Sequence, residues 1–498
     1  MNKIPRFLKL GGVPALVLGL IVSGPSTIAA TPDRPNIVFI ICDDLGINDL
    51  HCYDRADHQT PNLDQLSREG TRFTSAYCAQ PICSPSRVGV IMGKAPARLH
   101  LTTYLPGRAD SPAQKLLQPV IRQEVDLSEK SIARYFKEAG YITDLVGKWH
   151  IGGKGFGPAE HGFDVVSVGR NNTTPSDTEG SKGEFGLTRS AEDFLEKNRD
   201  RPFLLFLAHY TPHIPYSATP GQIAAHKDAF EPVYAAVIAS LDRAVGQLLA
   251  KLDELKLREN TIVVFTSDNG GLHVPELNHA RVTHNTPYRA GKGYLYEGGL
   301  RVPLIVRWPG HVPAGVTVDA PINNTGWIPT LLELAGQPAP KGLDGKSFAP
   351  LLTGRGQAPE RTFFWHFPHY NNQGGRPGGA VREGTWKLVE YYDAPDAPEL
   401  YQLSNDIGEK NNLAAQYPDR VSTMRRALAD WRKAIGAQTN LPNPNFDPAR
   451  YRELYVDFDP SRFDPLHASN SEWKAVQKWR SEMNAAVKGA PRAAPRSR

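Results

Sequence analysis

Two apolar, β-branched runs, each ending in oxygen-bearing side chains, constrain the fold most strongly. The first is Asn36-Ile-Val-Phe-Ile-Ile-Cys42, followed by Asp43-Asp44, and the second is Thr261-Ile-Val-Val-Phe-Thr-Ser267, followed by Asp268-Asn269. Neither run alternates apolar with polar residues, which predicts strands buried on both faces of a largely parallel sheet. Ligands gather at the carboxyl ends of such strands, so the runs bring four oxygen-bearing side chains to one sheet edge.

These four side chains indicate a metal site. Two adjacent carboxylates repel one another unless a cation lies between them. A helix-capping role accounts for one of Asp43 and Asp44 but poorly for both. Together with Asp268 and Asn269 they offer oxygen and neither sulfur nor imidazole, which favours a hard cation. We expect Ca²⁺, which tolerates irregular sets of six to eight ligands, with Mg²⁺ as the alternative.

A cysteine opens the apolar segment that runs to Gly93. The pentapeptide Cys83-Ser-Pro-Ser-Arg87 predicts a thiol at the mouth of a helix, with Arg87 facing the same mouth. Unpaired N–H groups and the helix dipole favour a bound oxyanion there. An ordinary buried cysteine before a turn remains the alternative. A cysteine-phosphatase loop requires five residues between cysteine and arginine, whereas this chain has three. We expect the irregular segment 94–125 to form a loop over this site.

Cationic and imidazole side chains follow three further stretches. Lys148 and His150 come after an apolar strand and would share one face of an extended segment. A buried strand over 202–209 ends in His209, and His213 follows it. Lys292 lies between glycines that permit close approach to a ligand. Each residue alone is more often structural, and the anion site makes a functional interpretation preferable for Lys148, His150 and Lys292.

Hydrophobic periodicity predicts three helices outside these sites. They span 60–70, capped by Thr60 and ended by Gly70, then 127–139 and 231–257. The polar segment 165–200 carries no clear pattern. After residue 360 the chain predicts short antiparallel strands over 363–370 and 384–392, separated by a glycine-rich loop. The predicted organisation is a signal peptide over 1–30, a catalytic domain over 31–360, a C-terminal subdomain over 361–480 and a basic disordered tail over 481–498.

The two ends of the chain account for its basic character. Net charge is +5, and cationic residues without acidic ones occupy both the first 30 residues and the range 488–498. Nothing here indicates a nucleic-acid partner. An apolar run behind Lys3, Arg6 and Lys9 is too short for a membrane span and predicts an exported protein, periplasmic or secreted. The four cysteines exclude a disulfide scaffold, and only Cys52 with Cys78 is considered as a bridge.

With these motifs in this order, the chain resembles the type I sulfatases of the alkaline-phosphatase-like superfamily from about Arg34 to Leu413. The resemblance rests on Asp43-Asp44, Cys83-Ser-Pro-Ser-Arg87, Gly147-Lys-Trp-His150, Pro212-His213, Ser267-Asp-Asn-Gly270, Gly291-Lys-Gly293, Tyr296-Glu-Gly-Gly299 and Leu400-Tyr-Gln-Leu-Ser-Asn-Asp406. It implies an α/β three-layer sandwich with a large, mostly parallel central sheet. The C-terminal subdomain would add a short antiparallel sheet.

The resemblance also implies a chemistry for each site residue. A maturation enzyme would oxidise Cys83 to formylglycine, whose hydrate has one hydroxyl to attack sulfur and another to release sulfate. Arg87, Lys148 and Lys292 would hold the sulfate oxygens, with His150 assisting the formylglycine and His213 the leaving group. The implied cation ligands are Asp43, Asp44, Cys83, Asp268 and Asn269. His209 has no firm family role and is considered only as a neighbour of the substrate.

The expected activity is hydrolysis of sulfate esters, either of sulfated carbohydrate, galactose-type residues included, or of aryl sulfate. His366, His369 and Arg376 in the C-terminal loop are the candidate sugar contacts, since this block resembles bacterial polysaccharide sulfatases. Two alternatives remain open. One is a phosphonate monoester hydrolase or phosphodiesterase, which shares the pentapeptide. The other is a non-catalytic sulfoglycan-binding protein in which Cys83 stays a thiol.

Overall fold

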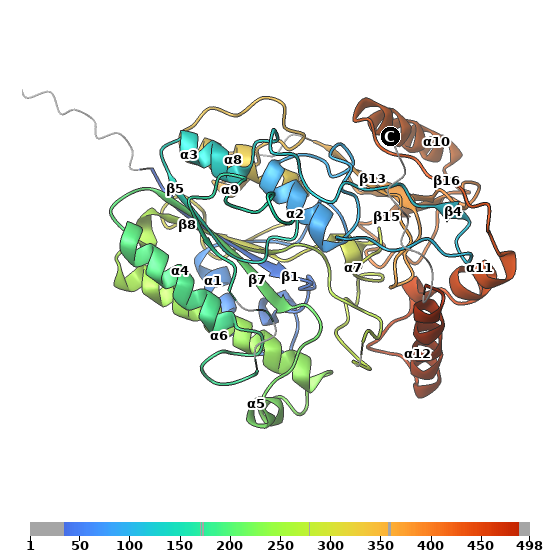
Figure 1. Ribbon diagram of the computed structural model, residues 1–498, viewed down its shortest axis with the longest axis horizontal. Helices are drawn as coiled ribbons and strands as arrows, with labels where there is room; N and C mark the ends of the chain where they lie inside the picture. Colours follow the sequence, from blue (N-terminus) through green and yellow to red (C-terminus); the bar gives the residue numbers. More distant parts are fainter. Residues whose placement is uncertain (1–33, 170, 172–173, 278, 357–359, 488–498) are drawn as a thin grey trace, which may run out of the picture. The chain divides into compact units, whose positions relative to one another are not determined.

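An eight-stranded sheet lies at the centre of the structure, a computed structural model that describes residues 34–169, 171, 174–277, 279–356 and 360–487 (Figure 1). Its strands in spatial order are β10 (Val316–Val318), β2 (Thr71–Phe73), β9 (Leu304–Arg307), β8 (Thr261–Ser267), β1 (Asn36–Asp43), β7 (Phe203–Pro212), β5 (Ile142–Gly147) and β6 (Val165–Ser167). All neighbours pair in parallel except β9, which is antiparallel to β2 and β8. The predicted mostly parallel sheet is confirmed.

Helices cover both faces of this sheet, which makes three layers (Figure 1). Alternate residues of β1 enter different cores: Phe39 packs into one cluster and Ile40 into the other. One face carries α2 (Cys83–Met92), α3 (Ile132–Glu138), α8 (Trp327–Leu334) and α9 (Ala349–Leu352). The other carries α1 (Pro61–Glu69), α4 (Glu184–Asn198) and α6 (Pro232–Glu254). Burial on both faces explains why the central strands lack polar alternation.

The predicted helices agree with the structure in two of three cases. α1 and α6 lie where the sequence placed them, although the Thr60 side chain accepts a hydrogen bond from His51 N instead of capping α1. The helix predicted from 127 begins only at Ile132, because the Ser131 side chain caps it by accepting from Arg134 N. In the segment 165–200, which showed no clear pattern, α4 buries apolar residues at helical spacing.

The C-terminal region forms a second, antiparallel sheet, as expected. Its four strands, in sequential order, are β12 (Thr362–Phe367), β13 (Gly378–Glu383), β14 (Trp386–Tyr391) and β15 (Glu399–Gln402). Helices α10 (Pro418–Ala434), α11 (Pro448–Tyr455) and α12 (Asn470–Ala485) follow it, and residues 481–485, predicted as a disordered tail, belong to α12. The remaining short elements are β3 (Ala76–Tyr77), β4 (Leu116–Leu117), α5 (Pro220–Ala225), α7 (Glu297–Leu300), β11 (Ile322–Asn323) and β16 (Leu441–Pro442).

A buried ion-pair cluster joins the second sheet to α7. Lys387 Nζ on β14 lies 2.7 Å from Glu297 Oε1 and 2.8 Å from Glu409 Oε1, and all three side chains are fully buried. Glu409 also accepts from the backbone N–H of Glu297. The cluster fixes α7 and the glycine-rich loop before it, and that loop carries Lys292.

Replacing Lys387 with methionine is expected to lower the free energy of unfolding by about 3–5 kcal/mol. The substitution leaves Glu297 and Glu409 buried together without their shared cation. Chemical denaturation of the variant measures the effect. Lys410→Met, which removes an exposed lysine from the same region, is the control and should unfold at the wild-type midpoint. Equal midpoints for both variants would show that the cluster adds no stability.

The described residues from Arg34 onward form one compact unit, and the predicted boundary at 360 stays a prediction. The predicted signal peptide lies outside the described residues, as do residues 488–498 of the tail. Within the described chain, α6 is the one helix long and apolar enough to cross a bilayer, and its apolar residues are mostly buried in a core.

All four cysteines are free. The Cys52–Cys78 bridge is wrong because the two residues pack on opposite faces of the sheet.

Candidate active site

The ends of β1 and β8 bring the predicted oxygen ligands together. Asp43 ends β1, and Asp44 follows with φ 67°, a left-handed conformation that aspartate tolerates. The backbone N–H of Asp44 donates to Asp268 Oδ1 at 3.1 Å, and that of Asp268 donates to the Cys42 carbonyl. Asn269 Nδ2 donates to Asp44 Oδ1 at 2.8 Å. Parallel pairing of β1 with β8 therefore explains the convergence that the sequence predicted.

The oxygen atoms of this cluster that accept no hydrogen bond from the described residues fit a hard cation. Asp43 Oδ1 and Asn269 Oδ1 are buried and have no hydrogen-bond partner within the described residues. Donor atoms of Asp43, Asp44, Cys83 and His213 all lie within 4.8 Å of one another. Unpartnered buried oxygens next to carboxylates are costly without a positive charge to bind. The oxygen donors thus suit Ca²⁺ or Mg²⁺. His213, which the sequence placed at the leaving group, lies beside them.

Cys83 is the first residue of α2 and lies beside this oxygen cluster. Its Sγ is 3.6 Å from Asp44 Oδ1, and its side chain is 1% exposed. Ile82 at the N-cap supplies no side-chain hydrogen bond, so the helix end keeps unpaired N–H groups for an anion. Burial, reinforced by Asp43, raises the pKa of the Cys83 thiol well above its usual value. An unmodified thiol here stays protonated and is a poor nucleophile.

Three cations, buried Arg87 and Lys292 and partly buried Lys148, surround the same point. Arg87, one turn into α2, donates from Nε to Asp268 Oδ2 at 2.8 Å, while its Nη2 has no hydrogen-bond partner among the described residues. Lys148 Nζ pairs with Asp43, and Lys292 Nζ lies 2.7 Å from Asp44 Oδ2. Burial opposes the charge on Lys292, but Asp44 outweighs it and holds the pKa of Lys292 well above its usual value. The three side chains therefore remain charged.

Two histidines complete the site. His150 has φ 63°, so it does not continue an extended strand, and the predicted strand alternation with Lys148 is wrong. Its Nε2 lies 3.2 Å from the Leu105 carbonyl, and burial, with Lys148, lowers its pKa to about 3. His213 Nδ1 lies 2.5 Å from the Ile214 carbonyl, which leaves Nε2 facing Asp44 Oδ2 at 3.6 Å.

The candidate sugar contacts are engaged in bonds within the protein. His366 is fully buried and bonds the Tyr392 hydroxyl and the Gln438 carbonyl. His369 bonds the Thr102 hydroxyl at 2.7 Å, and Arg376 forms an ion pair with Asp393 at 2.6 Å. His209 is fully buried on β7, and its ring nitrogens have no partner within the described chain. In this conformation, therefore, neither nitrogen of His366 is free for a ligand.

Sequence reasoning missed the residues that attach the surrounding loops to the site. The segment 94–125 lies against the site as expected, because Leu105 N donates to the Ser84 hydroxyl while its carbonyl contacts His150. Glu276 accepts hydrogen bonds from Asn372 and Gln373 and so joins the C-terminal loop to the β8 side. No local pattern marks these residues, since each partner lies far away in the sequence.

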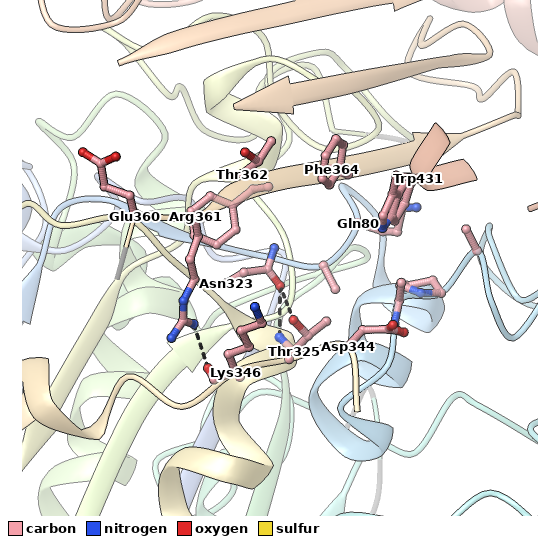
Figure 2. Close-up of a pocket in the computed structure, with 17 residues that line it drawn as sticks. Gln80, Asn323, Thr325, Asp344, Lys346, Glu360, Arg361, Thr362, Phe364 and Trp431 are labelled. Carbon is pink, nitrogen blue, oxygen red and sulfur yellow. Dashed lines mark hydrogen bonds between the residues drawn. The ribbon is translucent and has the colours of Figure 1, made fainter. Parts of the chain in front are cut away.

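A separate cavity of about 250 Å³ lies between the loop before α2 and strand β12 (Figure 2). Its walls include Gln80, Asn323, Lys346 and Arg361, with the ring of Trp431 beside Gln80. None of the predicted metal or catalytic residues lines it. Charge and unpartnered polar atoms, and not this cavity, therefore locate the candidate active site.

Comparison with known proteins agrees with the geometry. A family model described as Sulfatase matches residues 35–337, and one described as N-sulphoglucosamine sulphohydrolase, C-terminal, matches residues 290–434. The chain is 32% identical to arylsulfatase A of Homo sapiens, with 85% of this chain and 89% of that protein covered. It is 28% identical to an N-acetylgalactosamine-6-O-sulfatase of Bacteroides thetaiotaomicron, with 86% and 99% covered.

A solved structure with a related fold is that of Ps i-CgsB in complex with k-i-k-neocarrahexaose. It has 27% sequence identity and a TM-score of 0.69, and the match covers 91% of this chain and 99% of that one. The predicted α/β architecture is thereby confirmed. With the pentapeptide, the oxygen cluster and the three cations in place, the chain belongs to the sulfatase family and is a sulfuric ester hydrolase.

Proposed function

We propose that this sulfatase hydrolyses sulfate esters of a carbohydrate through a formylglycine made from Cys83. The observation that carries the proposal is the position of Cys83, at the start of α2 between the carboxylate cluster and the three cations. Its protonated thiol is a poor nucleophile, which supports conversion to another group. Conversion requires a maturation enzyme, which is the expected protein partner.

Asp43, Asp44, Asp268 and Asn269 would hold a divalent cation, for which Ca²⁺ is our proposal. When bound, such a cation lowers the pKa of a coordinated hydroxyl and neutralises charge on a sulfate ester. The two carboxylate oxygens of Asp268 accept hydrogen bonds from Asp44 N and Arg87 Nε, so Asp268 also orients these neighbours. The residue at position 83 lies within reach of the same carboxylates.

The cations bind and orient the sulfate group. Among the side-chain nitrogens of Arg87, Lys148 and Lys292, only Arg87 Nη2 has no hydrogen-bond partner in the described residues. This nitrogen faces Asp43. Lys148 and Lys292 reach the site from different loops and add two ammonium groups. Negative charge that develops on the transferring sulfur group is stabilised by these fixed positive charges, each worth on the order of 10²-fold in rate.

The two histidines handle protons. With its Nε2–H donating to the Leu105 carbonyl, His150 has a free acceptor at Nδ1, which is buried and without a partner in the described chain. Nδ1 would accept a proton from the group at position 83. His213, held through Nδ1 by the Ile214 carbonyl, would carry a second proton on Nε2 beside Asp44 and donate it to the leaving-group oxygen. Both roles follow from the ring nitrogen that each backbone carbonyl leaves free.

A carbohydrate substrate has support from the comparisons and from the C-terminal loop. Relatives are named for N-acetylgalactosamine-6-sulfate esters, and the Ps i-CgsB structure contains a neocarrahexaose. The loop behind β12 reaches the active site, because Asn371 Nδ2 donates to the Gly293 carbonyl next to Lys292. His366, His369 and Arg376 would then support this loop through their internal bonds. We further propose export to the periplasm or medium, where polysaccharides are met, on the basis of the N-terminal sequence.

Substrate comparison tests the proposal. Protein from its native source is expected to release sulfate from 4-methylumbelliferyl sulfate and from sulfated galactose oligosaccharides, but to act on an aryl phosphodiester at least about 10²-fold more slowly. Both esters are monoanions, so the expected preference rests on the family match and not on charge. Initial rates at equal concentration provide the measurement. Faster phosphodiester hydrolysis would favour the phosphonate monoester hydrolase alternative. Hydrolysis of the aryl sulfate without any of the oligosaccharides would refute the carbohydrate substrate.

A further inference from the structure

Arg108, in the segment that lies against the active site, has no counter-ion among the described residues. It lies in the segment that runs from α2 to β4, which pairs with β16 near the C-terminal helices (Figure 1). Its Nη2 donates to the Met483 carbonyl of α12 at 3.1 Å. Nε and Nη1 are buried and have no hydrogen-bond partner in the described part of the chain, and no described carboxylate forms an ion pair with it. Unpaired guanidinium donors in a buried position are costly unless an anion binds them.

Buried polar atoms without a partner among the described residues also occur at the catalytic centre, as they do at several other side chains, Arg307 and His161 among them. Asp43 Oδ1, Asn269 Oδ1 and Arg87 Nη2 are likewise buried without a partner among the described residues, at the positions where a cation and a sulfate group would bind. Arg480 offers the contrast. It is buried near Arg108, yet it bonds the Pro275 carbonyl, Asn484 and Glu276. Each side-chain nitrogen of Arg480 thus has a partner, whereas among the described residues Arg108 is bonded only through Nη2.

The backbone places Arg108 next to the site. Three residues before it, Leu105 bonds the Ser84 hydroxyl and contacts His150, which fixes the segment over the mouth of α2. Tyr104, the residue before Leu105, lies within electrostatic range of both regions: burial raises its pKa, Arg108 and Lys292 lower it, and the Glu276 carboxylate raises it. The Tyr104 hydroxyl, too, has no hydrogen-bond partner in the described chain. A ligand seated on Lys292 can therefore extend past Tyr104 towards Arg108.

We propose that Arg108 binds a second anionic group of the substrate, a sulfate ester or carboxylate adjacent to the ester that is hydrolysed. The inference rests on the proposed carbohydrate function and narrows it to saccharides with at least two anionic groups. The guanidinium fork suits an oxyanion, and Tyr104 adds a hydroxyl beside it. A small aryl sulfate carries no such group and does not use this contact.

Competition kinetics test the proposal. Hydrolysis of 4-methylumbelliferyl sulfate is measured in the presence of a galactose disaccharide with two sulfates or the same disaccharide with one. Wild type is expected to bind the disulfated form at least about tenfold more tightly, since one charge-assisted contact has that value. In Arg108→Gln the inhibition constants should become equal, while the KM for the aryl sulfate stays within about twofold.

Matched controls make the result decisive. Arg122→Gln removes a half-exposed arginine of the same segment and should keep the wild-type preference. If Arg108→Gln fails to fold, Arg108→Lys keeps the charge without the fork and is expected to lose most of the preference. An unchanged preference in the Arg108 variant, or none in wild type, overturns the inference.

A failure of the proposed carbohydrate hydrolysis is detected by a different measurement from a failure of the Arg108 proposal. Competition reports binding whether or not the disaccharides are hydrolysed. Sulfate release from them, followed by ion chromatography, reports hydrolysis. Tight binding without sulfate release would refute carbohydrate hydrolysis, while the preference between the two disaccharides would still decide the role of Arg108.

Discussion

Replacement of Cys83 with alanine is expected to abolish sulfate-ester hydrolysis, with a loss on the order of 10⁴-fold or more, and to leave the protein folded. The alanine removes the atom from which the nucleophile would be made, and no neighbouring side chain can replace it. Its structural cost is small, because Cys83 Sγ makes one weak contact, to Asp44. Initial rates on 4-methylumbelliferyl sulfate measure activity, and circular dichroism measures folding.

Two controls accompany this variant. Cys52→Ala removes a partly exposed cysteine outside the site and should retain full activity. The mass of the tryptic peptide 73–87 from wild type shows directly whether the thiol has become an aldehyde. Full activity in Cys83→Ala would overturn the mechanism. A free thiol in every wild-type molecule would exclude formylglycine and favour the binding-protein alternative.

Removal of the divalent cation is expected to lower activity on the order of 10³-fold, and added Ca²⁺ should restore it. Asp43 and Asp44 place two carboxylates at one point, Asp268 lies against the Asp44 backbone, and the adjacent sulfate ester would add further negative charge. Dialysis against a chelator followed by titration with Ca²⁺ gives the activity measurement. Calcium should also raise the melting temperature, because a ligand that binds only the folded state stabilises it.

The variant Asp43→Asn separates the cation from other effects. It should bind less metal by elemental analysis and lose the calcium-dependent rise in melting temperature. Asp126→Asn, at an exposed position, is the control and should respond to calcium like wild type. Full activity in metal-free protein, or a calcium response in Asp43→Asn equal to that of wild type, would contradict a cation held by these carboxylates.

The fold and the oxygen cluster were predictable from local sequence. β1 and β8 are continuous apolar runs, and such runs predict buried parallel strands whatever their neighbours are. The side chains just after them had to converge once the strands paired in parallel. Helix α6 was equally clear, because 23 residues carry one regular periodicity. Helix α4 was missed, since its charged residues obscure a short apolar stripe.

The candidate substrate contacts show where local reasoning stops. A block of histidine, tyrosine and arginine suggested sugar binding, yet His366 and His369 bond residues that are distant in the sequence. Polar residue types are the same whether they face a ligand or another loop. Their hydrogen-bond partners decide the difference, and those partners are set by packing between segments.

The sequence by itself determined the architecture and the chemical nature of the site, because strand burial and the pentapeptide are encoded within a few consecutive residues. Only the tertiary structure decided which charges are paired. It holds Lys148 and Lys292 on the carboxylates, places Lys387 between two buried glutamates and leaves Arg108 with no counter-ion in the part of the chain that the structure describes. The physical reason is that ion pairing depends on distances of a few ångströms between segments far apart in the chain, which local sequence patterns do not specify.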